Sequence, residues 1–279
     1  MKVLVIDRDR LASQMVRTKM EAMGHTVIEE AVKNNAIEIM GQEEIGAVFF
    51  DPAPLTNARP VVLGIRRSVT RYTYICMMSH NIDAKDAVDM GANDLLAKPI
   101  AAEDLQVKAE NASRLVELVA RIGDESEDFP SAGGVISKSA FNQLFLAAID
   151  RADRYGEMSN VLFISLSNYD DVKAIDGAYA AEYAVSKMAQ YLVKLRRQSD
   201  IIAQTGVNEY ALLLQRPQHE SEAQEAATRF AASLNDYTDI VSGGSTHVEI
   251  SVDLIDVPVC NQIFHQQVVH QAPQAQTAE

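Results

Sequence analysis

The first 122 residues alternate short apolar runs with amphipathic segments of helical period. Such alternation with short loops predicts an α/β domain, a doubly wound parallel sheet with helices on both faces. In this fold the ligand site lies at the carboxyl ends of the strands. The expected strands are Lys2–Ile6, Thr26–Glu29, Ala47–Phe50, Tyr74–Met78 and Asp94–Ala97, and the expected helices are Asp9–Met23, Lys33–Gly41, Ala58–Ser68, Ala84–Met90 and Ala102–Ile122.

A second domain with a different pattern is expected after an acidic linker. Residues 123–132 are acidic and poor in apolar side chains, which is typical of a linker. Residues 133–258 mix helices with strands, as in an α+β domain. The Gln-rich tail, residues 259–279, has no clear apolar face and is expected to be largely disordered. The expected helices are Lys138–Tyr155, Ala178–Arg197 and Glu220–Leu234, and the expected strands are Val161–Leu166, Ile201–Thr205, Glu209–Gln215 and Val248–Ile255.

Composition narrows the functional class. A chain of 279 residues with 47% hydrophobic content is long enough for one or two domains with apolar cores. No apolar run approaches the roughly 18 to 20 residues of a membrane span, and the first residues lack a signal-peptide cleavage site. Cys76 and Cys260 are far apart and indicate reduced thiols without zinc-ligand spacing. Because the net charge is −14, general nucleic-acid affinity is not expected. We expect a cytoplasmic protein without membrane insertion or a metal.

Four polar residues fall at the carboxyl ends of the expected strands of the first domain. They are Asp7, Asp51, Ser79 and Lys98, the last followed by Pro99. This arrangement resembles the phosphoacceptor pocket of a CheY-like receiver domain in a bacterial response regulator, and the resemblance covers the whole first domain. It implies that Asp51 accepts a phosphoryl group and that Asp7 is one of two acids that hold Mg²⁺. It also implies that Ser79 and Lys98 complete the pocket and that the Lys98–Pro99 peptide bond is cis.

Three positions depart from the receiver pattern. Arg8 replaces the second metal-binding acid, so a fixed positive charge stands where the metal would lie. An ion pair between Arg8 and Asp51 would mimic a neutralised pocket. His80 replaces a small residue beside the acceptor, and Leu95 replaces an aromatic switch residue. We expect a pseudo-receiver that Mg²⁺-dependent phosphorylation does not regulate, in which the acids and the lysine remain as a structural charge cluster.

The second domain resembles the diguanylate cyclase (GGDEF) family from Ser165 to Tyr210, where the two align without a gap. The signature loop corresponds here to Gly206-Val207-Asn208-Glu209-Tyr210. The family holds two Mg²⁺ ions with an acid on its first strand and an acid in this loop, and it makes cyclic di-GMP from two GTP molecules. Ser165 takes the place of the strand acid, and Val207 and Asn208 replace a glycine and an acid.

These replacements imply a degenerate cyclase that is not an enzyme. A β-branched valine resists the close backbone turns that glycine permits beside phosphates. Glu209 alone keeps a carboxylate, and we expect it to be a solvated acid in a hairpin turn. Lys173 and Glu182 occupy the positions of the guanine-binding asparagine and its aspartate partner. The basic residues of the family's closing helix are missing from the Gln-rich tail.

The family's inhibitory product site (I-site) has the form Arg-x-x-Asp, and this chain carries it at Arg197 and Asp200. Arg229, on the next expected helix, matches a second arginine once one inserted residue is allowed. Arginine binds phosphate oxygens or stacks on guanine, and a carboxylate accepts hydrogen bonds from the guanine N1–H and N2 amine. Alternatively, Arg196 and Arg197 are the basic C-terminal end of a helix and complement its dipole.

Three functions remain open from the sequence. The first is a catalytically inactive cyclic di-GMP effector that needs no cofactor and signals to a protein partner through the receiver face formed by about Ala84–Ile122. The second is a ligand-free scaffold or localisation protein that uses both domains as interaction surfaces. The third is an active enzyme or phosphorylation switch, which would have to tolerate Arg8 and Ser165. Because receivers often dimerise and the cyclic dinucleotide can cross-link two sites, a homodimer is compatible with all three.

Overall fold

The computed structural model describes residues 1–68, 72–124, 128–129, 133–217, 219, 221–241 and 244–271. Two compact units are present. The first contains Met1–Arg121 with Leu146–Glu157 and Pro258–Cys260, and the second contains Ile122–Phe145, Met158–Val257 and the chain from Asn261. Most of the expected linker lies outside the described residues. Asp128, which lies within it, accepts hydrogen bonds from the backbone nitrogen and the hydroxyl of Ser139 in the first turn of α6.

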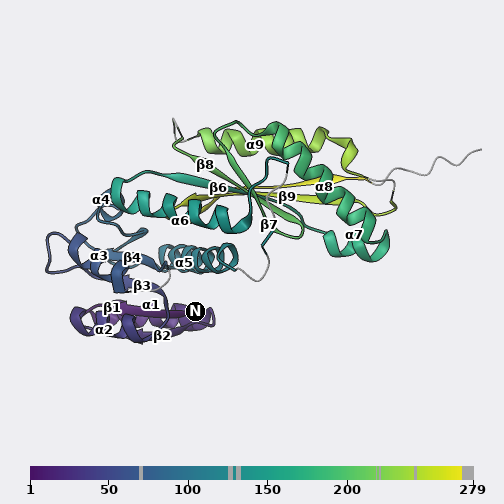
Figure 1. Cartoon of the computed structure of the whole chain (residues 1–279). Helices are drawn as coiled ribbons and strands as arrows, with labels where there is room; N and C mark the ends of the chain where they lie inside the picture. The colour runs from purple at the N-terminus through teal and green to yellow at the C-terminus, as the bar shows by residue number, and fades with distance from the viewer. Residues whose placement is uncertain are drawn as a thin grey trace, which may run out of the picture. The chain divides into compact units, whose positions relative to one another are not determined.

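The first unit is a five-stranded parallel sheet with the strand order β2-β1-β3-β4-β5. Helices connect the strands, so the topology is doubly wound and the strand order reverses at β1 and β3 (Figure 1). This confirms the expected fold class. The strands are β1 (Lys2–Ile6), β2 (Thr26–Glu29), β3 (Ile45–Phe50), β4 (Tyr74–Ser79) and β5 (Asp94–Ala97), and the helices are α1 (Arg10–Ala22), α2 (Lys33–Gln42), α3 (Arg59–Ser68), α4 (Ala84–Asp89) and α5 (Ala102–Ile122).

Local sequence explains how the first unit begins its helices and buries its strands. The carboxylate of Asp9 accepts hydrogen bonds from Leu11 and Ala12, so it caps α1 and points away from the strand end, as expected. Consecutive residues of β1 and β3 are fully buried because helices cover both faces of the sheet. Continuous apolar runs, rather than alternation, are therefore the signature of these strands.

A buried polar network joins β4, β5 and α5. The carboxylate of Asp94 accepts hydrogen bonds from Tyr74 Oη at 2.9 Å, Lys108 Nζ at 2.8 Å and Asn111 Nδ2 at 3.3 Å. Burial raises the pKa of Tyr74 well above its usual value, so this phenol stays a donor. The network fixes α5 against β4 and β5.

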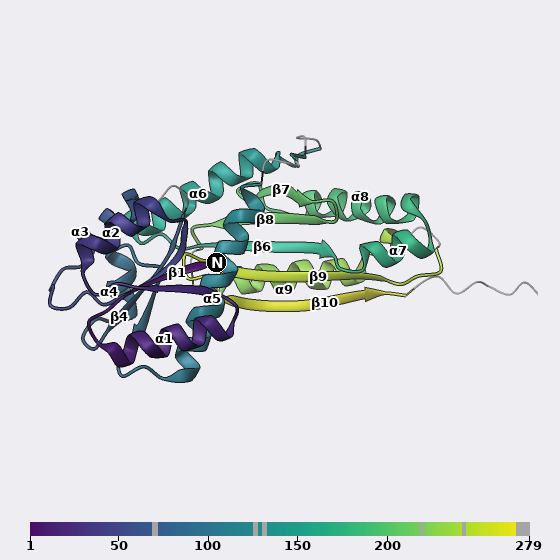
Figure 2. The same ribbon diagram turned by 90° about the horizontal axis from the view of Figure 1, so that it is seen from below.

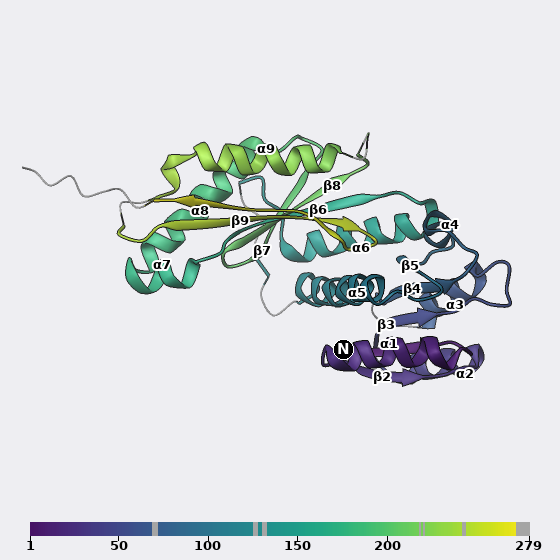
Figure 3. The ribbon, with the colours of Figure 1, turned by 180° about the vertical axis from the view of Figure 1, so that it is seen from behind.

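The second unit is a five-stranded antiparallel sheet with the order β10-β9-β6-β8-β7 (Figure 2). Helices α8 and α9 cover one face, where Met188, Leu192 and Phe230 pack against Ile164 and Leu212 (Figures 1 and 3). The strands are β6 (Ser159–Leu166), β7 (Ile201–Gly206), β8 (Glu209–Gln215), β9 (Val248–Val257) and β10 (Gln262–His270). The helices of this unit are α7 (Tyr169–Ile175), α8 (Ala178–Leu195), α9 (Glu222–Asp236) and the 3₁₀ turn η1 (Thr238–Ile240), together with the first half of α6 (Lys138–Tyr155), whose residues from Leu146 on belong to the first unit.

Two features of the second unit differ from expectation. The helix α7 was not expected, because seven residues are too few to show a helical period. The prediction of a disordered tail is wrong for residues 262–270, which form β10 and pair with β9. Val268 and His270 are buried and Phe264 packs on the core, so the strand alternates at period two although glutamine separates its apolar residues. Residues 272–279 lie outside the described part of the chain. None of the described helices combines the length and hydropathy that a bilayer crossing requires.

Candidate functional site

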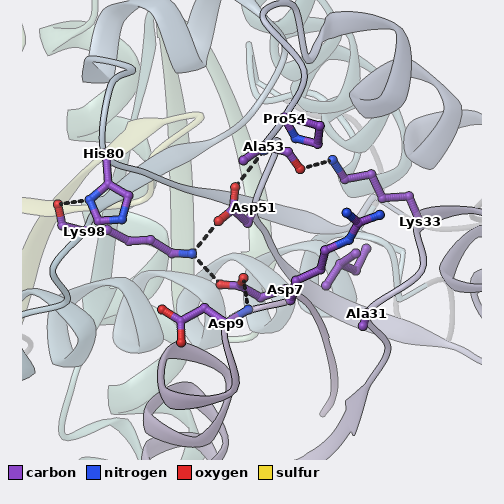
Figure 4. A pocket seen from close by; sticks show the side chains of 11 residues that line it. Asp7, Asp9, Ala31, Lys33, Asp51, Ala53, Pro54, His80 and Lys98 are labelled. Carbon is purple, nitrogen blue, oxygen red and sulfur yellow. Dashed lines mark hydrogen bonds and ion pairs between the residues drawn. The ribbon is translucent and has the colours of Figure 1, made fainter.

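Lys98 is the centre of a pocket of about 360 Å³ at the carboxyl ends of β1, β3 and β5 (Figure 4). Its ammonium group donates to Asp7 Oδ2 at 2.6 Å and forms a second ion pair with Asp51 Oδ2. The side chains of Lys98 and Asp7 are only 4% and 1% exposed. The structure therefore brings together the two acids and the lysine that the sequence singled out.

The other carboxylate oxygens of this triad are bonded to the backbone. Asp7 Oδ1 accepts from the backbone nitrogen of Asp9 at 2.8 Å, and Asp51 Oδ1 accepts from that of Ala53 at 2.7 Å. Burial alone would lower the pKa of Lys98, but the hydrogen bonds from its ammonium to the two carboxylates outweigh burial and raise that pKa. The lysine thus stays charged, and both acids are ion-paired with it.

Arg8, Lys33 and His80 also line the pocket, and Ser79 lies just outside the lining. No ion pair joins the described residues Arg8 and Asp51, and Lys98 supplies the positive charge beside Asp51 instead. Lys33, which sequence reasoning missed, donates to the carbonyls of Pro52 at 2.7 Å and Ala53 at 2.8 Å. Burial lowers the pKa of Lys33. Ser79 Oγ accepts from Asn81 at 3.2 Å outside the lining, and His80 Nδ1 lies 3.1 Å from the carbonyl oxygen of Lys98.

The donor set of this pocket does not fit Mg²⁺. A divalent cation of this kind needs several oxygen ligands, and here one cation already bridges the two acids while Arg8 and Lys33 add positive charge. In the described part of the chain, no group of three His, Cys, Asp or Glu residues is arranged to hold a metal ion. The Lys98–Pro99 peptide bond is cis, as the receiver resemblance implies.

The cyclase-like loop lies at the turn between β7 and β8. Ser165 on β6 is in register with Glu209 on β8 and with Ser251 on β9. Glu209 is 5% exposed, and its Oε1 accepts a hydrogen bond from Thr205 Oγ1 at 2.6 Å. The expectation of a solvated turn acid is therefore wrong. Glu209 is the first residue of β8, so its side chain lies over the sheet rather than on the turn.

The turn itself is fixed to the end of β6. The backbone nitrogen of Leu166 donates to Asn208 O at 2.9 Å, and Asn208 Nδ2 donates to Leu166 O at 2.8 Å. A methyl group on Gly206 would meet its nearest neighbour, Glu209 Cβ, at an ordinary 3.5 Å, so this backbone does not require glycine. Tyr210 is buried in the core, and burial raises its pKa to about 12.

The substitutes for the guanine-binding pair lie on the surface. Lys173 on α7 and Glu182 on α8 are both exposed. The ammonium group of Lys173 lies 5.7 Å from the centre of the Tyr169 ring, a cation–π distance. No ion pair joins these two described residues.

The Arg-x-x-Asp residues line a separate pocket of about 230 Å³ between the end of α8, the end of β8 and the start of α9. Arg197, Asp200 and Arg229 all contribute to it, so the structure brings these three sequence-predicted residues together. Two further charged residues were missed by sequence reasoning. Arg216 follows β8 with a left-handed φ of 51°, and Glu222 begins α9.

Internal contacts already engage the two motif residues. Asp200 is buried, and its Oδ2 accepts from the backbone nitrogen of Arg197 at 2.9 Å, while Asp200 N donates to Arg197 O at 3.1 Å. The exposed guanidinium group of Arg197 donates to the carboxylate of Glu222. This hydrogen bond raises the pKa of Arg197, which is therefore always charged. Arg229 is exposed on α9, with its guanidinium 5.7 Å from the Phe230 ring.

Comparison with protein families identifies the second domain. The family model described as diguanylate cyclase, GGDEF domain, matches residues 131–278. The chain belongs to the GGDEF family. Its GGDEF domain is thus the antiparallel unit that carries the loop of Glu209 and the pocket of Arg197, and it relates the chain to cyclic di-GMP signalling. A search of curated proteins found no match.

Solved structures similar to this GGDEF-family chain fall into two groups. A response regulator from Thermotoga maritima has 24% sequence identity over 40% of this chain and 95% of its own, with a TM-score of 0.37. The chemotaxis response regulator CheY4 of Vibrio cholerae has 22% identity over 40% and 97%, with a TM-score of 0.36. The GGDEF domain of TpbB (YfiN) from Pseudomonas aeruginosa has 24% identity over 43% and 74%, with a TM-score of 0.38.

Proposed function

We propose that this protein is a catalytically inactive GGDEF-family effector that binds cyclic di-GMP at Arg197, Asp200 and Arg229 and signals to a protein partner. The observation that supports it best is a contrast within one domain. The position of the catalytic strand acid holds Ser165, while the pocket at the end of α8 gathers three arginines around a buried aspartate.

The proposed loss of catalysis rests on the number of metal-binding carboxylates, because only Glu209 remains of the two that the family uses. Two-metal phosphoryl chemistry needs anionic ligands that hold both ions against the reacting phosphates. Beside Glu209 the neighbouring strands present the hydroxyls of Ser165 and Ser251, and Glu209 itself accepts a hydrogen bond from Thr205. A single hydrogen-bonded carboxylate does not fit a pair of Mg²⁺ ions.

The chemistry of the other pocket suits a cyclic dinucleotide. Arg197, Arg216 and Arg229 carry three positive charges against the two carboxylates of Asp200 and Glu222, in a chain whose net charge is −14. Guanidinium groups bind phosphate oxygens in pairs and stack on purines. The Oδ1 atom of Asp200 carries no protein hydrogen bond among the described residues, which leaves an acceptor for the guanine edge.

The receiver serves in this proposal as a pseudo-receiver, a protein-binding module without a phosphorylation switch. Its two acids are bridged by the ammonium group of Lys98 instead of a metal ion. In this proposal the partner surface is the face formed by α4, β5 and α5, about Ala84–Ile122, where the network around Asp94 ties α5 to β4 and β5. A rigid, preformed face loses little conformational entropy when a partner binds, which favours this face as the partner surface.

A ligand-free scaffold is the second candidate, and one observation favours it. The motif residues are satisfied without a ligand, because Arg197 pairs with Glu222 and Asp200 bonds to the backbone of Arg197. A solvated, self-capped helix end with no ligand-binding role would show the same contacts. The two candidates differ in nucleotide affinity, which the following experiment measures.

Isothermal titration calorimetry of cyclic di-GMP into the full chain tests the proposed function. We expect micromolar or tighter binding by the wild type and none by Arg197→Ala/Asp200→Asn, whose circular dichroism should match the wild type. No heat at two temperatures would favour the scaffold.

The chain should also fail to convert GTP in the presence of Mg²⁺, because the metal ligands are missing. Chromatography of the reaction mixture checks this. Formation of cyclic di-GMP would contradict the inactive assignment.

Phosphorylation should also fail. With acetyl phosphate and Mg²⁺, we expect no phosphoryl group on Asp51, because Lys98 already pairs with both acids and Arg8 opposes the cation. Intact-mass spectrometry at neutral pH checks this, with an active receiver treated in parallel to show that the reagent works. A mass gain of one phosphoryl group that disappears in Asp51→Asn would contradict the pseudo-receiver.

A further inference from the structure

The GGDEF domain's sheet has two edges, and they differ in how they are protected. At one edge, β7 is covered by the segment before α6: Ile136 forms a parallel bridge with Ala203, and its backbone nitrogen donates to Ile202 O at 2.9 Å. At the other edge, β10 pairs along its length with β9, and no second strand among the described residues pairs with its outer side (Figure 2). An unpaired edge of nine residues is a template for another strand.

The sequence of β10 lacks the features that normally prevent edge pairing. Gln262–His270 contains no Asp, Glu, Lys, Arg or Pro, although the chain as a whole carries a net charge of −14. Edge strands usually carry such residues because charge or proline blocks association. Here two large apolar side chains are exposed instead, Ile263 at 36% and Val269 at 43%.

Two copies of β10 have matching side chains when they pair antiparallel with Gln266 at the centre. In an antiparallel pair of two copies centred on that residue, Ile263 lies opposite the partner's Val269, and Phe264 lies opposite the partner's Val268. Polar residues then pair as well, His265 opposite the partner's Gln267. A register shifted by one residue in either direction places Ile263 or Val269 opposite a polar side chain, so apolar matching selects the register centred on Gln266.

We propose that two copies of this chain associate through β10, antiparallel and with Gln266 on the two-fold axis. The two five-stranded sheets then form one continuous ten-stranded sheet. The contact is isologous, so it closes with two copies and leaves no free strand edge on the β10 side. The outward backbone groups of β10 gain partners, and the exposed Ile263 and Val269 become cross-strand neighbours. A second copy as the occupant explains why the strand has no Asp, Glu, Lys or Arg and exposes two large apolar side chains.

Cysteine cross-linking tests the register. In the proposed dimer the two Gln266 residues are directly opposite, about 4.5 to 5.5 Å apart between Cα atoms, which is within disulfide reach. Cys76 and Cys260 are both buried, so they provide an unreactive background. We expect mild oxidation of the Gln266→Cys full chain to give a covalent dimer on non-reducing gels. The matched control is Gln262→Cys, whose two copies would be separated by eight residues, about 27 Å, and it should remain monomeric.

Light scattering after size-exclusion chromatography tests the interaction without a covalent bond. We expect a nucleotide-free wild-type dimer, and a monomer for Ile263→Lys/Val269→Lys, whose new charges lie opposite one another on an exposed strand. Circular dichroism should show that this variant stays folded. A monomeric wild type, or a dimer that survives in the lysine variant without cross-linking at residue 266, would overturn the proposal. Because no cyclic di-GMP is added, these outcomes are independent of the proposed ligand.

Discussion

Replacement of Lys98 by methionine is expected to lower the local stability of the parallel sheet by about 3 to 5 kcal/mol, the usual cost of removing one member of a buried ion pair. The ammonium group is the shared partner of Asp7 and Asp51, and the side chain of Asp7 is almost fully buried. Methionine keeps the length and fills the space but leaves two adjacent carboxylates without a cation. Hydrogen-exchange mass spectrometry should show the loss of protection in β1 and β3.

The GGDEF sheet and a second lysine supply the controls. Peptides from β6 and β8 should keep their wild-type exchange rates, because the variant side chain lies in the other unit. Lys33→Met removes a cation from the same pocket, but this ammonium bonds to the carbonyls of Pro52 and Ala53 instead of to carboxylates. We expect a cost of about 1 kcal/mol there. Equal effects of the two variants would contradict a stabilising triad.

The pH dependence of the Lys98 contribution has a definite sign. Its folded pKa is raised above the ordinary 10.5, so folding favours the protonated lysine. The stabilisation is then fully present below about pH 10 and is lost as the pH rises through the raised pKa. The difference in exchange protection between wild type and Lys98→Met should be constant from pH 7 to 9 and should shrink at more alkaline pH. A difference that grows with pH would contradict this sign.

The doubly wound fold of the first unit and its charged centre could be predicted from the sequence, because the site residues directly follow the apolar runs that predict the strands. Fully apolar strands with acids at their ends are visible as runs followed by Asp7 and Asp51, and parallel strands present those ends at one edge. The ion-pair partner of Asp51 could not be predicted, because it depends on the tertiary structure. Arg8 is adjacent to Asp7 in sequence, but the structure pairs Asp51 with Lys98, 47 residues away. Charge type predicts that a pair forms, not which cation forms it.

The GGDEF domain shows where sequence patterns fail. Glu209 follows a turn and is polar, but its register with Ser165 places it over the sheet, and only strand pairing reveals that burial. Strand β10 was missed because glutamine and histidine fill five of its nine positions, and its neighbour β9 supplies the hydrogen bonds that its composition does not predict. Glu222 lies 25 residues from Arg197, so only tertiary structure shows that the motif arginine is already paired.

Removing the charge of Glu222 should therefore strengthen cyclic di-GMP binding, while removing Arg197 should weaken it. Charge-assisted hydrogen bonds contribute about 1.5 to 3 kcal/mol, so Arg197→Ala is expected to weaken affinity roughly 10- to 150-fold. Glu222→Gln keeps the side-chain shape but no longer holds the guanidinium by an ion pair. The Arg197–Glu222 ion pair is solvent-exposed at Arg197, so breaking it costs about 1 kcal/mol at most. Glu222→Gln should therefore raise the affinity for cyclic di-GMP about 5-fold.

A double-mutant cycle measured by titration calorimetry separates this model from a general charge effect. If Glu222 acts through Arg197, its replacement should add nothing in the Arg197→Ala background, because no guanidinium remains to be released. Glu225→Gln is the matched control, one turn further along α9 and outside the pocket lining. An equal gain from Glu225→Gln, or a gain from Glu222→Gln that persists without Arg197, would show that the pocket responds only to net charge. A gain confined to the Arg197 background would identify the Arg197–Glu222 ion pair as the interaction that the ligand phosphate must displace.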